Sequence, residues 1–277
     1  MRKGEEIVVR MPKEWGGIVP SEVFLSEAKR IVDEAKRKDI VLRALGGVGI
    51  RLHSLDCADF SKRLGRLGVG QQEFSDLDFV AYRKQRNKME GFFSSLGYTK
   101  RRVTLSTASS ERHIYFHPDG WFSADVFFDK LLVANHPLDF RGRLELDYPT
   151  ITATELLLEK LQIVTFSEKD FKDTLILLFS HEVEEKDARE VINAKYIATL
   201  LSKDWGFWYT TTNNLKKIES LLPKMETIND DEQADILSKV NKLLECIERE
   251  PKATGWKLRA VVGPKKKWYQ HVETDEL

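Results

Sequence analysis

The stretch that most constrains the fold is residues 74–80, FSDLDFV. Apolar and acidic residues alternate in it, which predicts a β-strand. Alternate side chains of a strand share a face, so Asp76 and Asp78 project together, about 6.6–7 Å apart, while Leu77 and Phe79 face a core. Two carboxylates on one face of an apolar strand are unfavourable unless solvent or a cation such as Mg²⁺ neutralises them. Both interpretations, a solvated strand end and a metal site, are open from this stretch alone.

A third carboxylate, Asp125, lies in the middle of another apolar segment, residues 122–128. The preceding Pro-Asp-Gly at 118–120 predicts a hairpin turn between two strands. If the strand with Asp125 pairs beside the strand with Asp76 and Asp78, about 4.8 Å away, three carboxylates converge. Such convergence suits two divalent ions about 3.5–4 Å apart, as used for in-line phosphoryl or nucleotidyl transfer.

Upstream, an apolar strand at residues 40–45 runs directly into Gly46 and Gly47, and residues 48–53 read as a short helix that includes Arg51. Glycines at a strand-to-helix turn let backbone N–H groups approach a phosphate. They also simply permit a tight turn with positive φ. The segment is neither a Walker A loop nor a GxGxxG motif, so the sequence pattern leaves both interpretations open.

Charge is distributed unevenly along a chain that has 44 basic and 44 acidic residues. Lys and Arg outnumber Asp and Glu between residues 61 and 102, which suits an anionic substrate near the acidic strand. Residues 56–73 are polar, basic and glycine-containing, and they predict a loop beside the site.

From residue 151 onward the pattern becomes helical, with Lys160 in the first helix and Asp170 and Asp173 one turn apart in the next. Lys160 reads either as a surface lysine or as a site residue, and the two acids either as helix-dipole partners or as site residues. Further helices are expected at 184–201, 205–222 and 230–249. The fold expected is α+β, a mixed sheet flanked by helices in residues 1–150, followed by a helical bundle with a basic tail in residues 151–277.

Taken together, the Gly46-Gly47 turn, the Asp76–Asp78 strand, the EKL segment at 159–161 and the KDFKD segment at 169–173 resemble the nucleotidyltransferase superfamily with the polymerase-β-like fold. The segments are most similar to its AbiEii/MenT-like toxin branch. This resemblance implies that Gly46, Gly47 and Arg51 bind a nucleoside triphosphate. It also implies that Asp76, Asp78 and Asp125 hold two Mg²⁺ ions, and that Lys160, near the triphosphate, and Asp170 complete the catalytic site.

The function expected is Mg²⁺-dependent transfer of NMP from an NTP to an acceptor. The toxin branch implies an RNA acceptor such as the tRNA 3′ end, and a cognate antitoxin as partner. Two alternatives are open: a small-molecule acceptor, as in aminoglycoside nucleotidyltransferases, and a catalytically idle binding or regulatory module.

The sequence contains no apolar run near the roughly 18 residues that span a bilayer, and its charged N-terminus does not resemble a signal peptide. Its two cysteines, Cys57 and Cys246, imply no disulfide framework. A cytoplasmic protein without a membrane partner is therefore expected.

Overall fold

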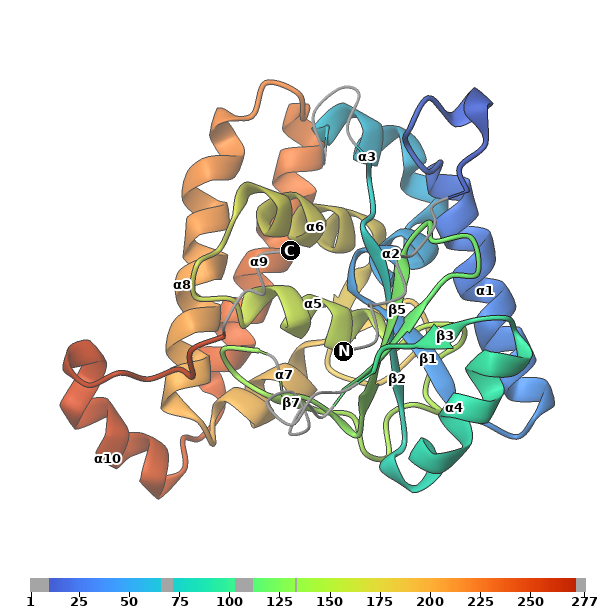
Figure 1. Ribbon diagram of the computed structural model, residues 1–277. Coiled ribbons are helices and arrows are strands. Elements are labelled where there is room, and N and C mark those ends of the chain that lie inside the picture. Colours follow the sequence, from blue (N-terminus) through green and yellow to red (C-terminus); the bar gives the residue numbers. More distant parts are fainter. Residues whose placement is uncertain (1–9, 66–71, 103–111, 133, 273–277) are drawn as a thin grey trace.

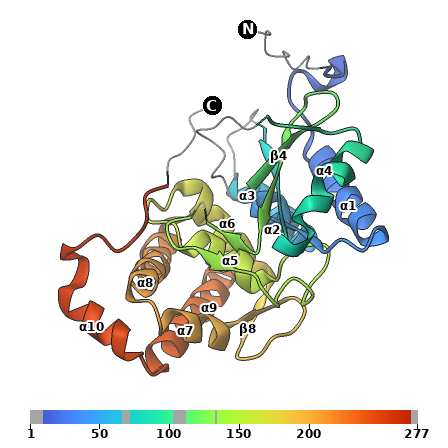
Figure 2. The same cartoon turned by 60° about the horizontal axis from the view of Figure 1, so that its bottom comes forward.

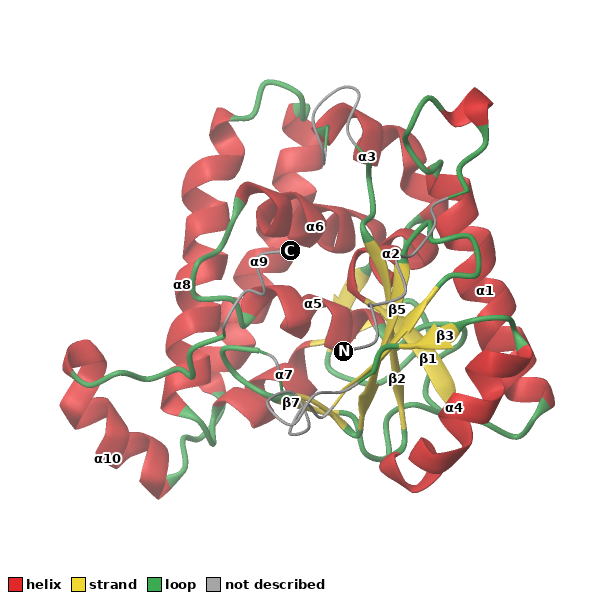
Figure 3. Cartoon of the chain, viewed as in Figure 1, coloured by secondary structure: helices red, strands yellow, loops and turns green. Residues whose placement is uncertain are grey.

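The computed structural model describes residues 10–65, 72–102, 112–132 and 134–272. A mixed β-sheet lies among helices on both of its faces (Figure 3). In the main sheet the strands run in the order β1-β2-β5-β4-β3, with β6 and β7 continuing from β5, whereas β8 and β9 form a separate parallel pair. The strands are β1 Leu42–Leu45, β2 Asp76–Ala81, β3 Thr99–Lys100, β4 Arg112–Phe116, β5 Ser123–Phe128, β6 Lys130–Leu131, β7 Leu138–Asp139, β8 Glu182–Glu184 and β9 Val191–Asn193.

The helices divide between the two faces of this sheet: α1 and α4 lie on one side, and α5 and α6 lie on the other, with α8 and α9 beyond them (Figure 1). This arrangement confirms the expected α+β class with a helical C-terminal part. The helices are α1 Ser21–Arg37, α2 Gly46–His53, α3 Ala58–Leu64, α4 Arg86–Ser95, α5 Ala153–Leu161, α6 Glu168–Ser180, α7 Ala194–Leu201, α8 Trp205–Leu221, α9 Asp230–Arg249 and α10 Thr254–Val262.

Strand alternation in β2 decides which side chains meet which helices. Leu77 and Phe79 are fully buried in a core that also contains Phe24 and Ile31 of α1. These two α1 residues recur seven positions apart, two helical turns, so they present one apolar stripe to the sheet. The intervening residues of β2 therefore face the opposite side of the sheet, toward α5 and α6.

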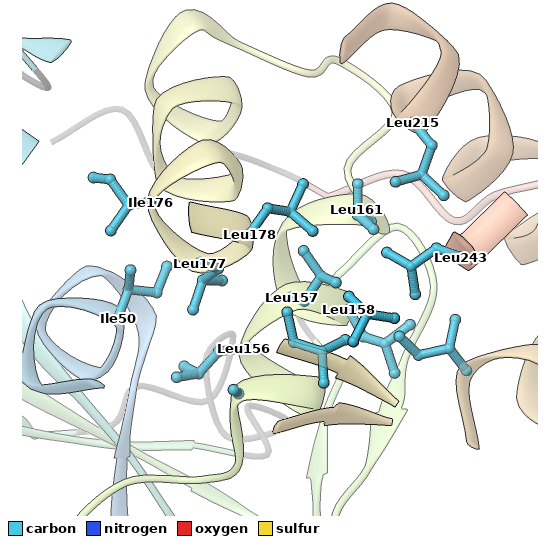
Figure 4. Close-up of a cluster of buried hydrophobic side chains, with 14 of the residues drawn as sticks. Ile50, Leu156, Leu157, Leu158, Leu161, Ile176, Leu177, Leu178, Leu215 and Leu243 are labelled. Carbon is cyan, nitrogen blue, oxygen red and sulfur yellow. The ribbon is translucent and has the colours of Figure 1, made fainter. Parts of the chain in front are cut away.

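The second core lies on that opposite side and is rich in leucine (Figure 4). Leu156 of α5 and Ile50 of α2 belong to it, together with Leu215 of α8 and Leu243 of α9. This core thus includes residues from before and after position 150. The division into domains at residue 150 stays a prediction.

Two segments differ from the sequence prediction. Residues 58–64 form helix α3 rather than a loop, because Phe60 and Leu64, one turn apart, are both buried and Phe60 stacks on Phe179 at 4.0 Å. The helix expected at 184–201 begins only at Ala194, because residues before it form β8 and β9. The remainder of the predicted basic loop, residues 66–71, lies outside the described part of the chain.

The C-terminal segment turns back onto α8 after the outlying helix α10 (Figure 2). Trp268 donates its indole N–H to Thr210 over 3.0 Å and contacts Tyr209 edge-on. Trp205 stacks on Tyr209, so this aromatic cluster of α8 packs against the C-terminal segment of the same chain. Among the described residues, no helix is long and apolar enough to cross a bilayer.

Candidate functional site

The three aspartates singled out in the sequence lie together on the sheet. Strands β2 and β5 are parallel neighbours, and Asp78 is paired in register with Asp125. Cross-strand partners in a parallel pair project to the same face, and Asp76 shares that face because it lies two residues from Asp78. The three carboxylates therefore lie on the face of the sheet opposite to Leu77 and Phe79. Figure 1 shows α5 and α6 on that side of the sheet.

Gly46 closes one side of this acidic face. Its φ of +67° is in the left-handed region, and its position brings it so close to β2 that a Cβ there would lie 2.6 Å from Oδ2 of Asp78. The register explains this proximity, because Leu45 at the end of β1 pairs with Asp78. Only glycine satisfies both the backbone conformation and the close approach.

A fourth carboxylate, Glu159 of α5, joins the site through Gly46. The backbone N–H of Gly46 donates to Oε2 of Glu159 over 3.1 Å. This contact means that the Gly46 N–H is directed at a carboxylate in the structure, and not at open space in front of the α2 N-terminus. Sequence reasoning did not assign Glu159 a role, although it lies in the same EKL segment as Lys160.

Negative charge is concentrated around Asp78. Burial is the largest cause that raises the pKa of Asp78 well above its usual value, followed by the charges of Asp76, Glu159 and Asp125, whereas Lys160 opposes the shift. Burial also raises the pKa of Glu159, again against the effect of Lys160. Four carboxylates and one lysine thus influence one another at this place.

Lys160 is anchored between two acids of α6. Its Nζ lies 3.4 Å from Oδ1 of Asp170 and 3.1 Å from Oδ2 of Asp173. The side chain of Asp173 is only 1% exposed, so Lys160 stabilises a buried negative charge at this position. Asp170 also caps α6 by accepting hydrogen bonds from Ser167, which explains why this acid stands at the start of the helix.

Arg112 of β4 adds a cation on the other side, with its Nη1 2.9 Å from Oδ2 of Asp125. The sequence analysis missed this residue. The only available signal was its place before the hairpin, since β4 pairs antiparallel to β5 and brings Arg112 to the edge of the acidic face.

Gly47 and Arg51, the two other residues predicted to bind the nucleotide, lie in different places. Gly47 directly follows Gly46 in the first turn of α2, beside the acidic face. Arg51 lies one turn farther along α2 and lines a cavity of about 360 Å³ together with Ser61, Lys62 and Glu73. Among the described residues, its Nη1 donates a hydrogen bond to the carbonyl oxygen of Ser54 over 3.4 Å. The described contacts therefore do not bring Arg51 to the three aspartates.

The donor set fits a hard divalent cation. Asp76, Asp78 and Asp125 offer carboxylate oxygens from two adjacent strands, and carboxylate oxygens are the protein ligands that Mg²⁺ prefers. The crowding of like charge around Asp78 is a second indication, because such an arrangement is stabilised by a bound cation.

No protein-family model and no curated protein sequence matches this chain significantly. Among solved structures, one match is the solution structure of the antibiotic-resistance factor ANT(2″)-Ia, with 14% sequence identity and a TM-score of 0.34. The match covers 58% of this chain and 84% of the other. A TM-score of this size does not establish a shared fold.

Proposed function

We propose that this protein is a nucleotidyltransferase that moves NMP from an NTP to a hydroxyl acceptor with the help of Mg²⁺. The observation that carries the proposal is the in-register pair Asp78 and Asp125 on parallel strands, with Asp76 on the same face. Three carboxylates on one face of a sheet are the kind of ligands that two-metal nucleotidyl transfer uses.

In the proposed reaction the acceptor oxygen forms a bond to the α-phosphorus, the bond to the bridging oxygen breaks, and pyrophosphate leaves. Bound Mg²⁺ would supply charge neutralisation at the phosphates and at the acceptor oxygen. Asp76 and Asp78 would hold the ions. Asp125, on the neighbouring strand β5, would help to hold the second ion and, assisted by that ion, would take the proton of the acceptor hydroxyl.

Basic groups surround these carboxylates. Lys160 lies close enough to Asp78 to influence its pKa and is oriented by Asp170 and Asp173. Arg112 contacts Asp125. In the proposed complex both cations face the triphosphate. Gly46 has no side chain, so it leaves room for the nucleotide close to Asp78.

For the acceptor we propose an RNA 3′ end, such as that of tRNA, in a toxin–antitoxin setting, following the resemblance of the sequence segments to that branch. The described basic residues Arg83, Lys84, Arg86 and Lys88 precede or open α4, which lies on the side of the sheet away from the aspartates, and Lys100 pairs with Glu90, so the RNA acceptor follows from the resemblance alone. A small cationic acceptor is the competing outcome.

The test is transfer of label from each of the four α-³²P NTPs, with Mg²⁺, into total RNA, a panel of small molecules and the protein itself. Wild type is compared with Asp76→Ala and Asp78→Asn. Asp139→Asn serves as the matched control, because Asp139 belongs to the same sheet but pairs with Arg141.

We expect labelled RNA with wild type and Asp139→Asn, and a loss of at least about 10³-fold with both site variants, since removal of a metal ligand removes charge stabilisation. Label in a small molecule would show that the acceptor is not RNA, and it would leave the proposed nucleotidyl transfer in place. No label in any acceptor, together with no Mg²⁺-dependent thermal shift by any NTP, would overturn the proposal in favour of an idle module.

A further inference from the structure

A second cluster of metal-ligating side chains lies at the other end of α2. His53 is the last residue of α2, His181 follows α6 directly, and Glu190 directly precedes β9. The histidine side chains are 2% and 0% exposed, whereas that of Glu190 is 49% exposed. One ligand atom from each residue lies within 4.8 Å of the others. No residue of the nucleotidyl-transfer site belongs to this cluster.

The hydrogen bonds of His181 determine which ring nitrogen carries hydrogen. Its Nδ1 lies 2.9 Å from the carbonyl oxygen of Leu177, an acceptor only, so Nδ1 must carry the hydrogen. In the neutral ring Nε2 is then a bare lone pair. That nitrogen lies 3.1 Å from Oε2 of Glu190, which is also an acceptor when ionised.

His53 shows the same pattern of contacts, with the roles of Nδ1 and Nε2 exchanged. Its Nε2 lies 3.0 Å from the carbonyl oxygen of Ile151 and 3.5 Å from Oδ2 of the buried Asp147. Both are acceptors, so Nε2 carries the hydrogen, and the bare Nδ1 lies 3.0 Å from the same Oε2 of Glu190. The other oxygen of this carboxylate, Oε1, is turned toward Arg189 at 3.7 Å.

With both rings neutral, three electron pairs thus converge with no hydrogen among them, and a proton on one ring would satisfy only one of the two contacts to Oε2. Protonating both rings would satisfy the contacts, but it would place two imidazolium rings, whose centroids are 5.3 Å apart, in a buried site. A single divalent cation satisfies all three atoms at once. Histidines that bind metals typically donate their other ring N–H to a backbone carbonyl or a carboxylate, and both histidines here do so.

We infer that His53 Nδ1, His181 Nε2 and Glu190 Oε2 form a binding site for a divalent transition-metal ion of the Zn²⁺ class. Imidazole and carboxylate ligands suit Zn²⁺, whereas Mg²⁺ prefers oxygen ligands alone. Tetrahedral bonds of about 2.0–2.2 Å separate neighbouring ligand atoms by about 3.3–3.5 Å. The observed 3.0 and 3.1 Å to Oε2 of Glu190 differ from this by a few tenths of an ångström, and the two ring nitrogens lie within 4.8 Å of each other.

The ion would join the C-terminal end of α2 to α6 and β9. The N-terminal end of the same helix carries Gly46, which approaches Asp78 and Glu159. The metal therefore acts as a structural clamp that holds α2 in place against the helices after residue 150. A clamp between residues so far apart in sequence stabilises the folded state, because metal binding free energy adds to folding free energy.

The experiment uses the full chain in the Asp76→Ala/Asp78→Ala background, so that the acidic face cannot bind the probe ion. Zn²⁺ is titrated by calorimetry, Tm is measured with and without Zn²⁺, and Co²⁺ is added to record the visible d–d bands of a tetrahedral site. Glu190→Gln removes one ligand charge at a half-exposed position, so it leaves packing intact. Asp147→Asn tests a positioning residue, and His136→Gln is the control for a buried histidine outside the cluster.

We expect one Zn²⁺ per chain, a raised Tm and tetrahedral Co²⁺ bands in the background protein and in the His136→Gln control. Glu190→Gln should lose the bands and bind Zn²⁺ at least about tenfold more weakly, and Asp147→Asn about 10–100-fold more weakly. The inference is overturned if the background protein binds no Zn²⁺, or if Glu190→Gln binds it equally well. Because the readouts do not use transfer activity, they stand whether or not the proposed function is correct.

Discussion

Gly46 and Asp78 approach so closely that the lightest side chain at position 46 would place its Cβ 2.6 Å from Oδ2 of Asp78. The contact joins the start of α2 to the centre of the acidic face. It makes the glycine a geometric requirement of the proposed site.

Gly46→Ala should therefore lower the free energy of unfolding by at least about 1 kcal/mol, because an L-residue at φ +67° is strained and its methyl group displaces Asp78. Transfer activity should fall with it. Gly91→Ala is the matched control, since α4 leaves open space there and alanine should stabilise by about 0.5–1 kcal/mol. Urea unfolding of both variants checks the prediction, and equal stability of the two would contradict it.

Lys160 has a structural and a proposed catalytic role that a double substitution separates. Lys160→Met removes the cation beside the buried Asp173 and should destabilise the protein by about 3–5 kcal/mol. Adding Asp173→Asn removes one of the two carboxylates that Lys160 pairs with and should restore part of that stability while transfer stays absent. Denaturant midpoints and the labelling assay measure the two effects. Transfer that recovers together with stability would limit Lys160 to a structural role.

In the proposed site Arg112 would compete with a metal ion for the carboxylate of Asp125, which its Nη1 contacts. Arg112→Gln should therefore lower the Mg²⁺ concentration needed for half-maximal thermal stabilisation by about fivefold, equivalent to the roughly 1 kcal/mol of a partly exposed ion pair, when NTP is left out because Arg112 is also proposed to face the triphosphate. Arg141→Gln is the control, because Arg141 pairs with Asp139 on the same sheet. An Mg²⁺ requirement that is unchanged or increased in Arg112→Gln would show that the arginine does not compete with the ion.

The burial of His136 leads to a prediction of how the free energy of unfolding depends on pH. Burial lowers its pKa to about 4, while its ring stacks on Phe207 and hydrogen-bonds Thr210. The unfolded chain takes up this proton near pH 6.5, so stability present above pH 6.5 is lost as the pH falls toward 4. His136→Gln should remove on the order of 3 kcal/mol of this pH-dependent loss in the free energy of unfolding. Urea midpoints from pH 7 to pH 4 measure it, and an unchanged slope in the variant would refute the assignment.

The amino-acid sequence alone was sufficient for the local geometry of the site. Strand alternation placed Asp76 and Asp78 on one face, and the glycine pair marked the turn from strand to helix. The hairpin turn before Asp125 was also predictable, and with it the possibility that a third carboxylate joins the first two. These features depend on backbone periodicity over a few residues, which side-chain order specifies directly.

Tertiary structure alone decided which distant residues complete the sites. Glu159 meets Gly46 across 113 positions of the chain, and Arg51, although it lies on the same helix as Gly46, turns to another cavity. His53 and Glu190 come together across 137 positions. Such contacts depend on how whole helices pack over the sheet, and that packing is set by the combined burial of many apolar side chains, which no short stretch of sequence encodes.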